Sequence, residues 1–359
     1  MASSPLETSS IPDHTPFVIR SYHFKLHIVF TGIIMKSRNL HAMEKVALLS
    51  AAAGLGVYCF EHYRRKNKKH QIPTALLQSP YASELQVAVK LALQCGKNMT
   101  DFCDQKGTAL EENHDLGIAT KGQPEDFCTK VDVENERLVI QGILEKFPSH
   151  QIIGEESTGT GKIPALTSAP TWIIDPIDGT TNFASGFPLT CVSIGFCMNG
   201  KPVMGTVYAP VTNELYLAVK GFGAFRNGVK ITKRTTKELR DSVLCIEFGY
   251  SRRAEAIAKM VGALTQILEH GVRTVRIVGS GVLDLCYVAT GRLDAVYAGV
   301  AGEGWKPWDY CAGVVVANEA GCVTEAIDQE QPGDFDLYSS SIICAGSHEL
   351  VQEIRRVIL

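Results

Sequence analysis

The stretch WIIDPIDGTTNF, residues 172–183, predicts a short buried strand that ends in a carboxylate. Its first three residues are apolar, which is typical of a short strand covered on both faces, and Asp175 follows them directly. Pro176 cannot donate a hydrogen bond to a neighbouring strand and has a fixed φ angle, so we expect the strand to stop at Asp175. The stretch therefore predicts an acidic side chain at the end of a strand.

The second half of the stretch predicts a turn followed by a helix. Asp178-Gly179 is typical of turns, and residues 180–182 are Thr-Thr-Asn, which commonly cap the start of a helix. The carboxylates of Asp175 and Asp178 would repel each other unless a cation lay between them, and free N–H groups at a helix start attract an anion such as phosphate. Two interpretations stay open: a site where a divalent metal meets a phosphate, or a strand–turn–helix junction with a capping aspartate.

Length and composition indicate an ordinary globular protein. The chain has 359 residues, of which 45% are hydrophobic and 20% charged, and this suits one large domain or two halves that share a core. The net charge of −3 gives no indication of a nucleic-acid partner. Residues 1–80 contain ten basic and four acidic side chains, so residues 81–359 carry a net charge of −9, which suits a site that concentrates metal cations.

The cysteine pattern argues against a disulfide framework. The eleven cysteines are an odd number, are scattered along the chain and form no C-x-x-C pair, which is typical of reduced thiols in a cytosolic-type compartment. No cysteine–histidine cluster has the spacing of a zinc site. We therefore expect Cys128, Cys191 and Cys311, which lie near the predicted site, to be packing residues.

Residues 1–80 differ from the rest of the chain and are expected to form an N-terminal extension. Residues 1–42 show no clear periodicity, and Met43 is an alternative start. Residues 46–60 carry no charge, but a helix of this length reaches only about 22 Å, short of the roughly 30 Å core of a bilayer. The basic run that follows fits a membrane anchor over residues 46–69, and a targeting segment fits the same facts. An apolar helix beside a linker is the third alternative.

The regular part of the sequence begins near Tyr81, after a linker expected over residues 71–80. Its apolar residues follow helical spacing in some segments and strand spacing in others, so we expect mixed α and β structure in layers, with sheets covered by helices. The expected elements are helices over residues 81–103, 133–147 and 252–270, strands over residues 151–153 and 273–278, β-rich runs between residues 189 and 225, and helices after Gly279 and Trp308.

Three further stretches place polar side chains at strand ends and helix starts. Residues 153–157 (IGEES) carry two glutamates at the end of a predicted strand, and residues 306–313 (KPWDYCAG) place Asp309 at a helix start. Residues 121–132 (KGQPEDFCTKVD) carry a lysine and end in Asp132 just before a helix. Each has an ordinary explanation as a surface pair, a cap or a solvated loop. Together they lie where layered α/β folds place their sites.

The order GEES, W-x-I-D-P-I-D-G-T-T-N-F and W-D-x-x-A-G resembles the inositol monophosphatase family over residues 81–359. The resemblance implies an α+β fold, the layered α-β-α-β-α sandwich that fructose bisphosphatases share, and in many members a homodimer. It also implies membership of a wider group of lithium-sensitive, magnesium-dependent phosphatases. The related 3′-phosphoadenosine nucleotidases usually follow D-G-T with Lys-Glu, so Thr-Asn-Phe at residues 181–183 favours the inositol monophosphatase branch.

For the metals, the resemblance implies two or three Mg²⁺ ions held by carboxylate and carbonyl oxygens. Asp175 matches the carboxylate that bridges two ions. Hard oxygen ligands suit magnesium rather than zinc. The implied ligands are Glu155, Asp175, Ile177 through its backbone oxygen, Asp178 and Asp309.

For catalysis, the resemblance implies hydrolysis of a phosphate monoester by a metal-activated water, with no covalent intermediate. Glu155 and Asp175 are expected to hold that water, and Thr180, paired with Asp132, is expected to orient it. Lys121 matches a basic residue of a loop over the site. The residues expected to contact substrate are Asp178, Gly179, Thr180, Ser280, Glu303 and Asp309.

The part of the site that would bind the alcohol departs from the family pattern. Family members that act on inositol usually have a glutamate where this chain has Ala298. We expect Glu303, from a longer loop, to replace it, and a solvent-exposed loop acid is the alternative. Ser280, at a glycine-rich helix start, either faces the alcohol or belongs to a plain cap. The expected substrate is myo-inositol monophosphate, with a sugar 1-phosphate of the galactose 1-phosphate type or another small monoester as the alternative.

A different class of function is a membrane-tethered scaffold that has lost catalysis. Every acidic ligand position is filled, which makes this a remote alternative. The catalytic domain is expected in the cytoplasm, either free or anchored through the N-terminal extension, and targeting to an organelle fits the sequence as well.

Overall fold

The fold is described from a computed structural model of the chain. The structure describes residues 70–103, 116–121, 124–329 and 333–359. Contacts divide the chain into Met1–Asn67 and Lys68–Leu359, and all of the described residues belong to the second unit. The alternative start at Met43 and the apolar segment 46–60 lie outside the described residues. None of the helices within the described ranges has the length and apolar character needed to cross a membrane.

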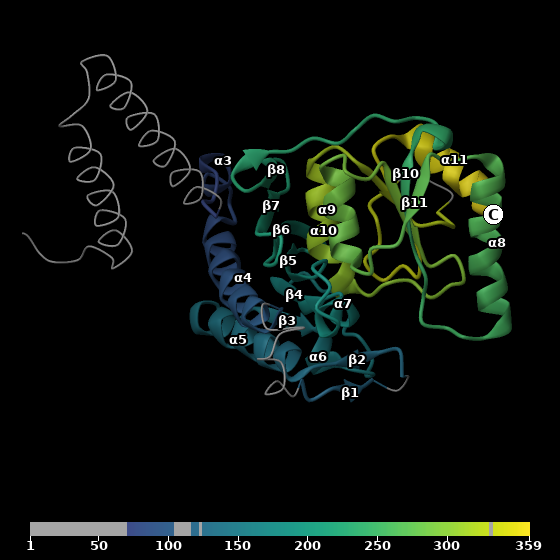
Figure 1. The fold of residues 1–359 in the computed structure, drawn as a ribbon. Coiled ribbons are helices and arrows are strands. Elements are labelled where there is room, and N and C mark those ends of the chain that lie inside the picture. The colour runs from purple at the N-terminus through teal and green to yellow at the C-terminus, as the bar shows by residue number, and fades with distance from the viewer. Residues whose placement is uncertain (1–69, 104–115, 122–123, 330–332) are drawn as a thin grey trace, which may run out of the picture. The chain divides into compact units, whose positions relative to one another are not determined.

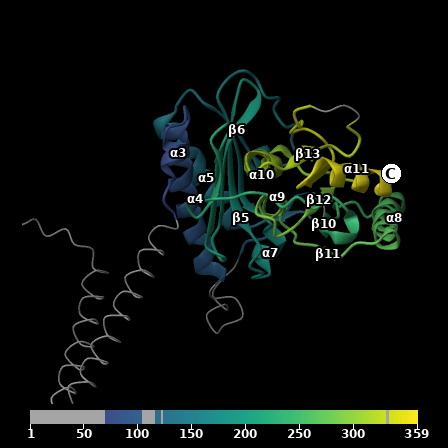
Figure 2. The same cartoon turned by 90° about the horizontal axis from the view of Figure 1, so that it is seen from above.

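Helices and sheets alternate in five layers within this unit, which confirms the expected layered α+β sandwich (Figure 1). Figure 2 shows the same order from above, with one helical layer between the two large sheets and one on the outer face of each. The first helical layer is α4 (Ala82–Cys103) and α5 (Lys130–Lys146), the central layer is α9 (Gly281–Ala289) and α10 (Pro307–Glu319), and the last is α8 (Ala254–His270) and α11 (His348–Ile358).

The larger sheet has the strand order β3-β4-β5-β6-β7-β8-β9. β3 pairs with β4 in parallel, and each later neighbour pairs antiparallel. Asn199 and Asn213 adopt positive φ angles of 53° and 54° in the connecting turns, a conformation that asparagine tolerates well. The strands are β3 (Gln151–Gly154), β4 (Thr171–Asp178), β5 (Cys191–Met198), β6 (Lys201–Ala209), β7 (Glu214–Val219), β8 (Gly223–Arg226) and β9 (Val229–Lys230).

The smaller sheet has the strand order β11-β10-β12-β14-β13. β10 pairs in parallel with β11 and β12, whereas β14 pairs antiparallel with β12 and β13. Its strands are β10 (Val243–Glu247), β11 (Thr274–Arg276), β12 (Ala295–Ala298), β13 (Val323–Glu325) and β14 (Ile342–Ala345). The short elements are a hairpin of β1 (Ala119–Thr120) and β2 (Phe127–Cys128), and the helices α3 (Thr74–Leu77), α6 (Glu155–Thr158), α7 (Thr180–Ala184) and η3 (Leu239–Asp241).

Strand β4 continues past Asp175, so the expectation that it stops there was wrong. The strand runs to Asp178, and its register against β5 shifts between Asp175 and Asp178. Pro176 lies inside this irregular segment, where regular pairing is interrupted and a missing N–H removes no ladder hydrogen bond. Both carboxylates therefore belong to one strand.

The segment 71–80, expected to be a linker, packs onto the folded unit. It contains α3, whose Leu76 side chain is 0% exposed and belongs to the same apolar core as α4 and the larger sheet. His70 lies just before it, with 2.7 Å between Nε2 and Oδ1 of Asn213. The folded unit therefore begins before residue 81.

Candidate active site

Three aspartates from two elements converge at the end of β4. Asp175 and Asp178 come from that strand, and Asp309 lies in the first turn of α10, where its carboxylate accepts the Lys306 N–H at 2.6 Å. One carboxylate oxygen from each aspartate lies within 4.8 Å of the others. The side chains of Asp175 and Asp178 are buried. The structure thus brings together three of the acids that the sequence singled out.

Burial and like charge both act on this acidic centre. Burial, followed by the charges of Glu155, Asp178 and Asp309, raises the pKa of Asp175 well above its usual range. Burial also raises the pKa of Asp178 to about 6, although Ser280 and Val282 donate hydrogen bonds to it. Carboxylates in such surroundings need protons or cations between them. Their hard oxygen donors fit a divalent ion such as magnesium.

Glu155 adds a fourth carboxylate, and Lys121 contacts it. Glu155 begins α6 directly after β3, and Lys121 Nζ lies 2.6 Å from its Oε1 and 2.7 Å from Oε1 of Glu156. Burial lowers the pKa of Lys121, but the two glutamates outweigh this and hold it above its usual range. The lysine expected in a loop over the site therefore lies against a predicted metal ligand.

Glu136 supports this corner of the site and was missed by the sequence analysis. Its carboxylate, buried on α5, accepts the backbone N–H groups of Glu156 at 2.8 Å and Ser157 at 2.7 Å. A Cβ added at Gly154 would lie 2.6 Å from the carboxyl carbon of Glu136, so the turn needs glycine here. The sequence did offer a signal: Glu136 lies one turn before Val139, so it falls on the face of the helix expected to be buried.

The predicted pair of Thr180 and Asp132 is present. Thr180 Oγ1 lies 3.3 Å from Asp132 Oδ1 and 3.1 Å from the carbonyl oxygen of Ile177. Asp132 is fully buried and caps α5 in a reciprocal arrangement with Thr129. Burial raises the pKa of Asp132 to about 6, against the opposing effect of its hydrogen bonds from Thr129. The role of the Ile177 carbonyl as a metal ligand stays a prediction.

The turn after β4 is shaped by Gly179 and held by Ser280. Gly179 has a φ of +80°, and an added Cβ would lie 2.9 Å from the carbonyl oxygen of Gly279. The Ser280 hydroxyl donates a hydrogen bond to Asp178, and the Val282 N–H donates another at 3.1 Å. The structure thus gives Ser280 a contact with a predicted metal ligand, and its contact with substrate stays a prediction.

Glu303 already has protein partners. Its Oε2 accepts the Ser251 N–H at 2.7 Å, and its Oε1 lies 3.4 Å from Nη2 of Arg253. The side chain is 34% exposed, so it is neither a free loop acid nor fully enclosed. Its expected role in place of the residue missing at Ala298 stays a prediction.

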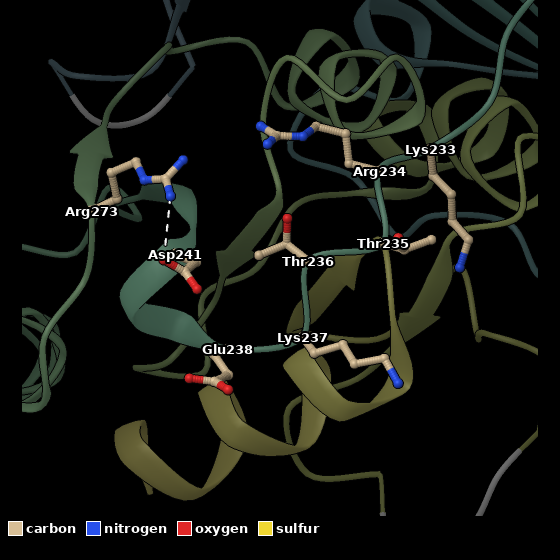
Figure 3. Close-up of a pocket in the computed structure, with 8 residues that line it drawn as sticks. All are labelled: Lys233, Arg234, Thr235, Thr236, Lys237, Glu238, Asp241 and Arg273. Carbon is tan, nitrogen blue, oxygen red and sulfur yellow. Dashed lines mark hydrogen bonds and ion pairs between the residues drawn. The ribbon is translucent and has the colours of Figure 1, made fainter.

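A separate polar cavity of about 600 Å³ lies between the segment that precedes β10 and Arg273, and no residue of the acidic centre lines it (Figure 3). Three of its four basic side chains are paired with acids, and the fourth, Lys233, donates to the carbonyl oxygen of Gly346. Arg273 Nη2 lies 3.2 Å from Asp241 Oδ1, and Lys237 Nζ lies 2.8 Å from Glu349 Oε1. We assign no chemistry to this cavity.

Comparison with known proteins places the chain in a family. The inositol monophosphatase family matches residues 80–358. Inositol monophosphatase 1 of Homo sapiens is 36% identical over 282 residues, which cover 79% of this chain and 96% of the human protein.

Solved structures agree with this match. The inositol monophosphatase of Anabaena (Nostoc) sp. PCC 7120 is 30% identical with a TM-score of 0.63, over 78% of this chain and 96% of that one. SaIMPase-II, solved with inositol monophosphate bound, is 25% identical with a TM-score of 0.58, over 76% and 92%. These matches define the class as a layered α+β phosphoric monoester hydrolase. The chain belongs to the inositol monophosphatase family.

Proposed function

We propose that this chain hydrolyses the phosphate monoester of a small polyol, with myo-inositol monophosphate as the first candidate, and that it uses magnesium. The observation that carries the proposal is the gathering of Asp175, Asp178 and Asp309 within 4.8 Å, with Glu155 acting on the same Asp175 carboxyl. Membership of the inositol monophosphatase family supports a phosphate monoester as the substrate.

Asp175 is the carboxylate that the other three acids act on. The charges of Glu155, Asp178 and Asp309 all raise its pKa, so Asp175 is the group that would contribute to holding both ions. We assign the five predicted ligands to these ions, the Ile177 carbonyl included. When bound, magnesium supplies Lewis-acid chemistry, because it polarises the phosphate and lowers the pKa of a water molecule.

Thr180 and Asp132 would orient the attacking water. Because the Thr180 hydroxyl donates to Asp132, its oxygen lone pairs are left to accept a hydrogen bond from that water. Asp132 must be ionised to keep this arrangement. The backbone N–H groups of Gly179 and Thr180 would bind phosphate oxygens, and the left-handed turn at Gly179 that leads into α7 supports this role. No side chain needs to form a covalent phosphoenzyme.

The alcohol part of the substrate would lie near Glu303 and Ser280. The complex of SaIMPase-II with inositol monophosphate supports an inositol phosphate as substrate. A sugar 1-phosphate of the galactose 1-phosphate type is the second candidate, because Ala298 offers no carboxylate to the hydroxyl groups.

Phosphate release from a panel of sugar and polyol monophosphates tests the function. We expect the fastest release from myo-inositol monophosphate with magnesium present, and none when a chelator removes the metal. Unchanged release in chelator, or none from any monoester, would contradict the proposal.

We also propose that residues 1–67 form a separate extension, that the catalytic unit is a homodimer and that it lies in the cytoplasm. Membrane attachment through residues 46–69 is part of this proposal, and targeting to an organelle is the alternative. A chain that starts at Lys68 should keep full activity and the molecular mass of a dimer. Loss of activity, or the mass of a monomer, would count against it.

A further inference from the structure

A second group of acids lies behind the acidic centre. Glu247 is the last residue of β10, and Asp284 lies in the first turn of α9. Together with Cys245 they place one ligand atom each within 4.8 Å of one another. Asp284 is 0% exposed, and its Oδ2 has no hydrogen-bond donor among the described residues.

Glu247 holds the turn that leads into α9. Its Oε1 accepts the backbone N–H groups of Val278 and Gly279, each at 2.7 Å. Gly279 has a φ of +74°, so the turn has a defined left-handed bend. The next residue, Ser280, donates its hydroxyl to Asp178. Glu247 therefore acts on a predicted metal ligand through one short turn.

The groups that face this pair are acidic or weakly polar. The Cys245 thiol donates to Asp284 Oδ1 at 3.2 Å, and Asp178 is the other charged group that acts on Asp284. In the described part of the chain, no salt bridge reaches Glu247 or Asp284. A buried carboxylate close to a half-buried one, without a cation, is disfavoured unless the two share a proton.

The proton belongs on Asp284. Two backbone N–H donors stabilise the ionised form of Glu247, whereas Asp284 has only the weak thiol donor. An ionised Asp284 would leave Oδ2 buried without a donor. A neutral Asp284 needs an acceptor instead, and Glu247 is the carboxylate within hydrogen-bonding reach. Burial and then the charge of Glu247 raise the pKa of Asp284 well above its usual range, in agreement with this assignment.

We propose that Asp284 is a neutral acid that donates a hydrogen bond to Glu247, and that the pair positions Asp178 through the turn at residues 278–280. Both are positioning residues, because neither contacts the substrate. The inference deepens the proposed function and rests on it for the activity measurements, but the protonation state can be measured without any substrate.

The first measurement is the infrared spectrum of the metal-free full chain near neutral pH. A carboxylic acid C=O band that shifts in D₂O and is lost in Asp284→Asn is expected. Persistence of every such band in Asp284→Asn, or no band in the unsubstituted chain, would overturn the assignment. This result holds even if none of the tested monoesters is hydrolysed.

The second measurement compares two substitutions in the full chain. Asp284→Asn keeps a donor to Glu247, so its apparent magnesium affinity and kcat should stay within about twofold of the unsubstituted chain. Asp284→Ala removes the donor, and a loss of roughly tenfold or more in apparent magnesium affinity is expected, as for other residues that orient metal ligands. Circular dichroism would check that both variants fold. Equal losses in the two variants would overturn the donor role.

A metal at Cys245, Glu247 and Asp284 is the competing explanation. Metal analysis of the purified chain tests it directly, with Cys245→Ser as the comparison. We expect no tightly bound transition metal in either. One equivalent that is lost on substitution of Cys245 would show that a cation, rather than a proton, separates the two carboxylates.

Discussion

Thr180 donates a hydrogen bond to Asp132, with 3.3 Å between Oγ1 and Oδ1, although 48 positions separate them in sequence. The bond joins the turn after β4 to the first turn of α5. Asp132 is held there by its reciprocal cap with Thr129, so its orientation does not depend on Thr180. Because Asp132 is ionised and fixed in position, the Thr180 hydroxyl stays oriented toward it.

Asp132→Asn should lower kcat with little change in magnesium affinity. The amide is a weaker acceptor for the Thr180 hydroxyl, and loss of general-base assistance typically costs roughly 10²-fold or more in rate. Steady-state kinetics over a magnesium titration checks this, with Asp101→Asn on the exposed face of α4 as the control. An unchanged kcat would remove Thr180 and Asp132 from the mechanism.

The pKa of Asp132 also predicts a pH dependence of stability. Its folded value of about 6 lies above the ordinary value of 3.8, so the folded state binds this proton more tightly than the unfolded state does. This contribution to the free energy of unfolding is present at low pH and is lost as the pH rises from about 4 to about 6. The free energy of unfolding of the metal-free chain, measured with urea, should therefore fall less steeply with rising pH in Asp132→Asn than in the unsubstituted chain. Identical slopes would contradict the raised pKa.

Glu136→Gln should weaken both stability and magnesium binding. Glutamine has one carbonyl oxygen for the two N–H groups of Glu156 and Ser157, and leaving a buried N–H unpaired costs about 1–3 kcal/mol. The turn that carries Glu155 should then loosen, with a loss of roughly tenfold in magnesium affinity. Glu145→Gln, exposed on the same helix, is the matched control for calorimetric titration and urea unfolding. Wild-type magnesium affinity in Glu136→Gln would refute the supporting role.

Glu303→Gln should reduce kcat/KM selectively on the polyol substrate. The amide oxygen can keep the Ser251 N–H bond, so the loop should hold its shape while the charge is lost. Losing one partner of a substrate hydroxyl costs roughly 1–3 kcal/mol. The comparison is with p-nitrophenyl phosphate, which carries no polyol. Equal losses on both esters, or none on either, would show that Glu303 does not recognise the alcohol.

The sequence predicted the parts of the site that lie in contiguous motifs. Asp175, Asp178 and Thr180 occur within one stretch, and the strand and turn that carry them follow from local propensity. The spacing of apolar residues predicted mixed layers with sheets covered by helices, and the α-β-α-β-α order came from the resemblance. Three local expectations were wrong. Residues 71–80 pack onto the folded unit through Leu76, and α5 begins at Lys130, before Asp132. The end of β4 was misplaced because a bulge accepts Pro176 within a strand, and a bulge depends on the partner strand.

What the sequence did not predict depends on contacts between distant segments. Glu136 reaches Ser157 across 21 positions, and Ser280 reaches Asp178 across 102. The partners of Glu303 lie on the segment after β10, so its side chain could not be assigned from its own loop. No local propensity encodes such pairs, because packing of separate layers brings them together.

The rate of phosphate release by Asp175→Asn tests the central claim most directly. The charges of Glu155, Asp178 and Asp309 all act on the buried Asp175 carboxyl, so its loss should remove both metals and several kcal/mol of transition-state stabilisation. Asp241→Asn, at an exposed ion pair with Arg273, is the control that should keep full activity. We predict that Asp175→Asn releases phosphate at least roughly 10³-fold more slowly at saturating magnesium. Turnover close to that of the unsubstituted chain would contradict a metal-bridging role for Asp175.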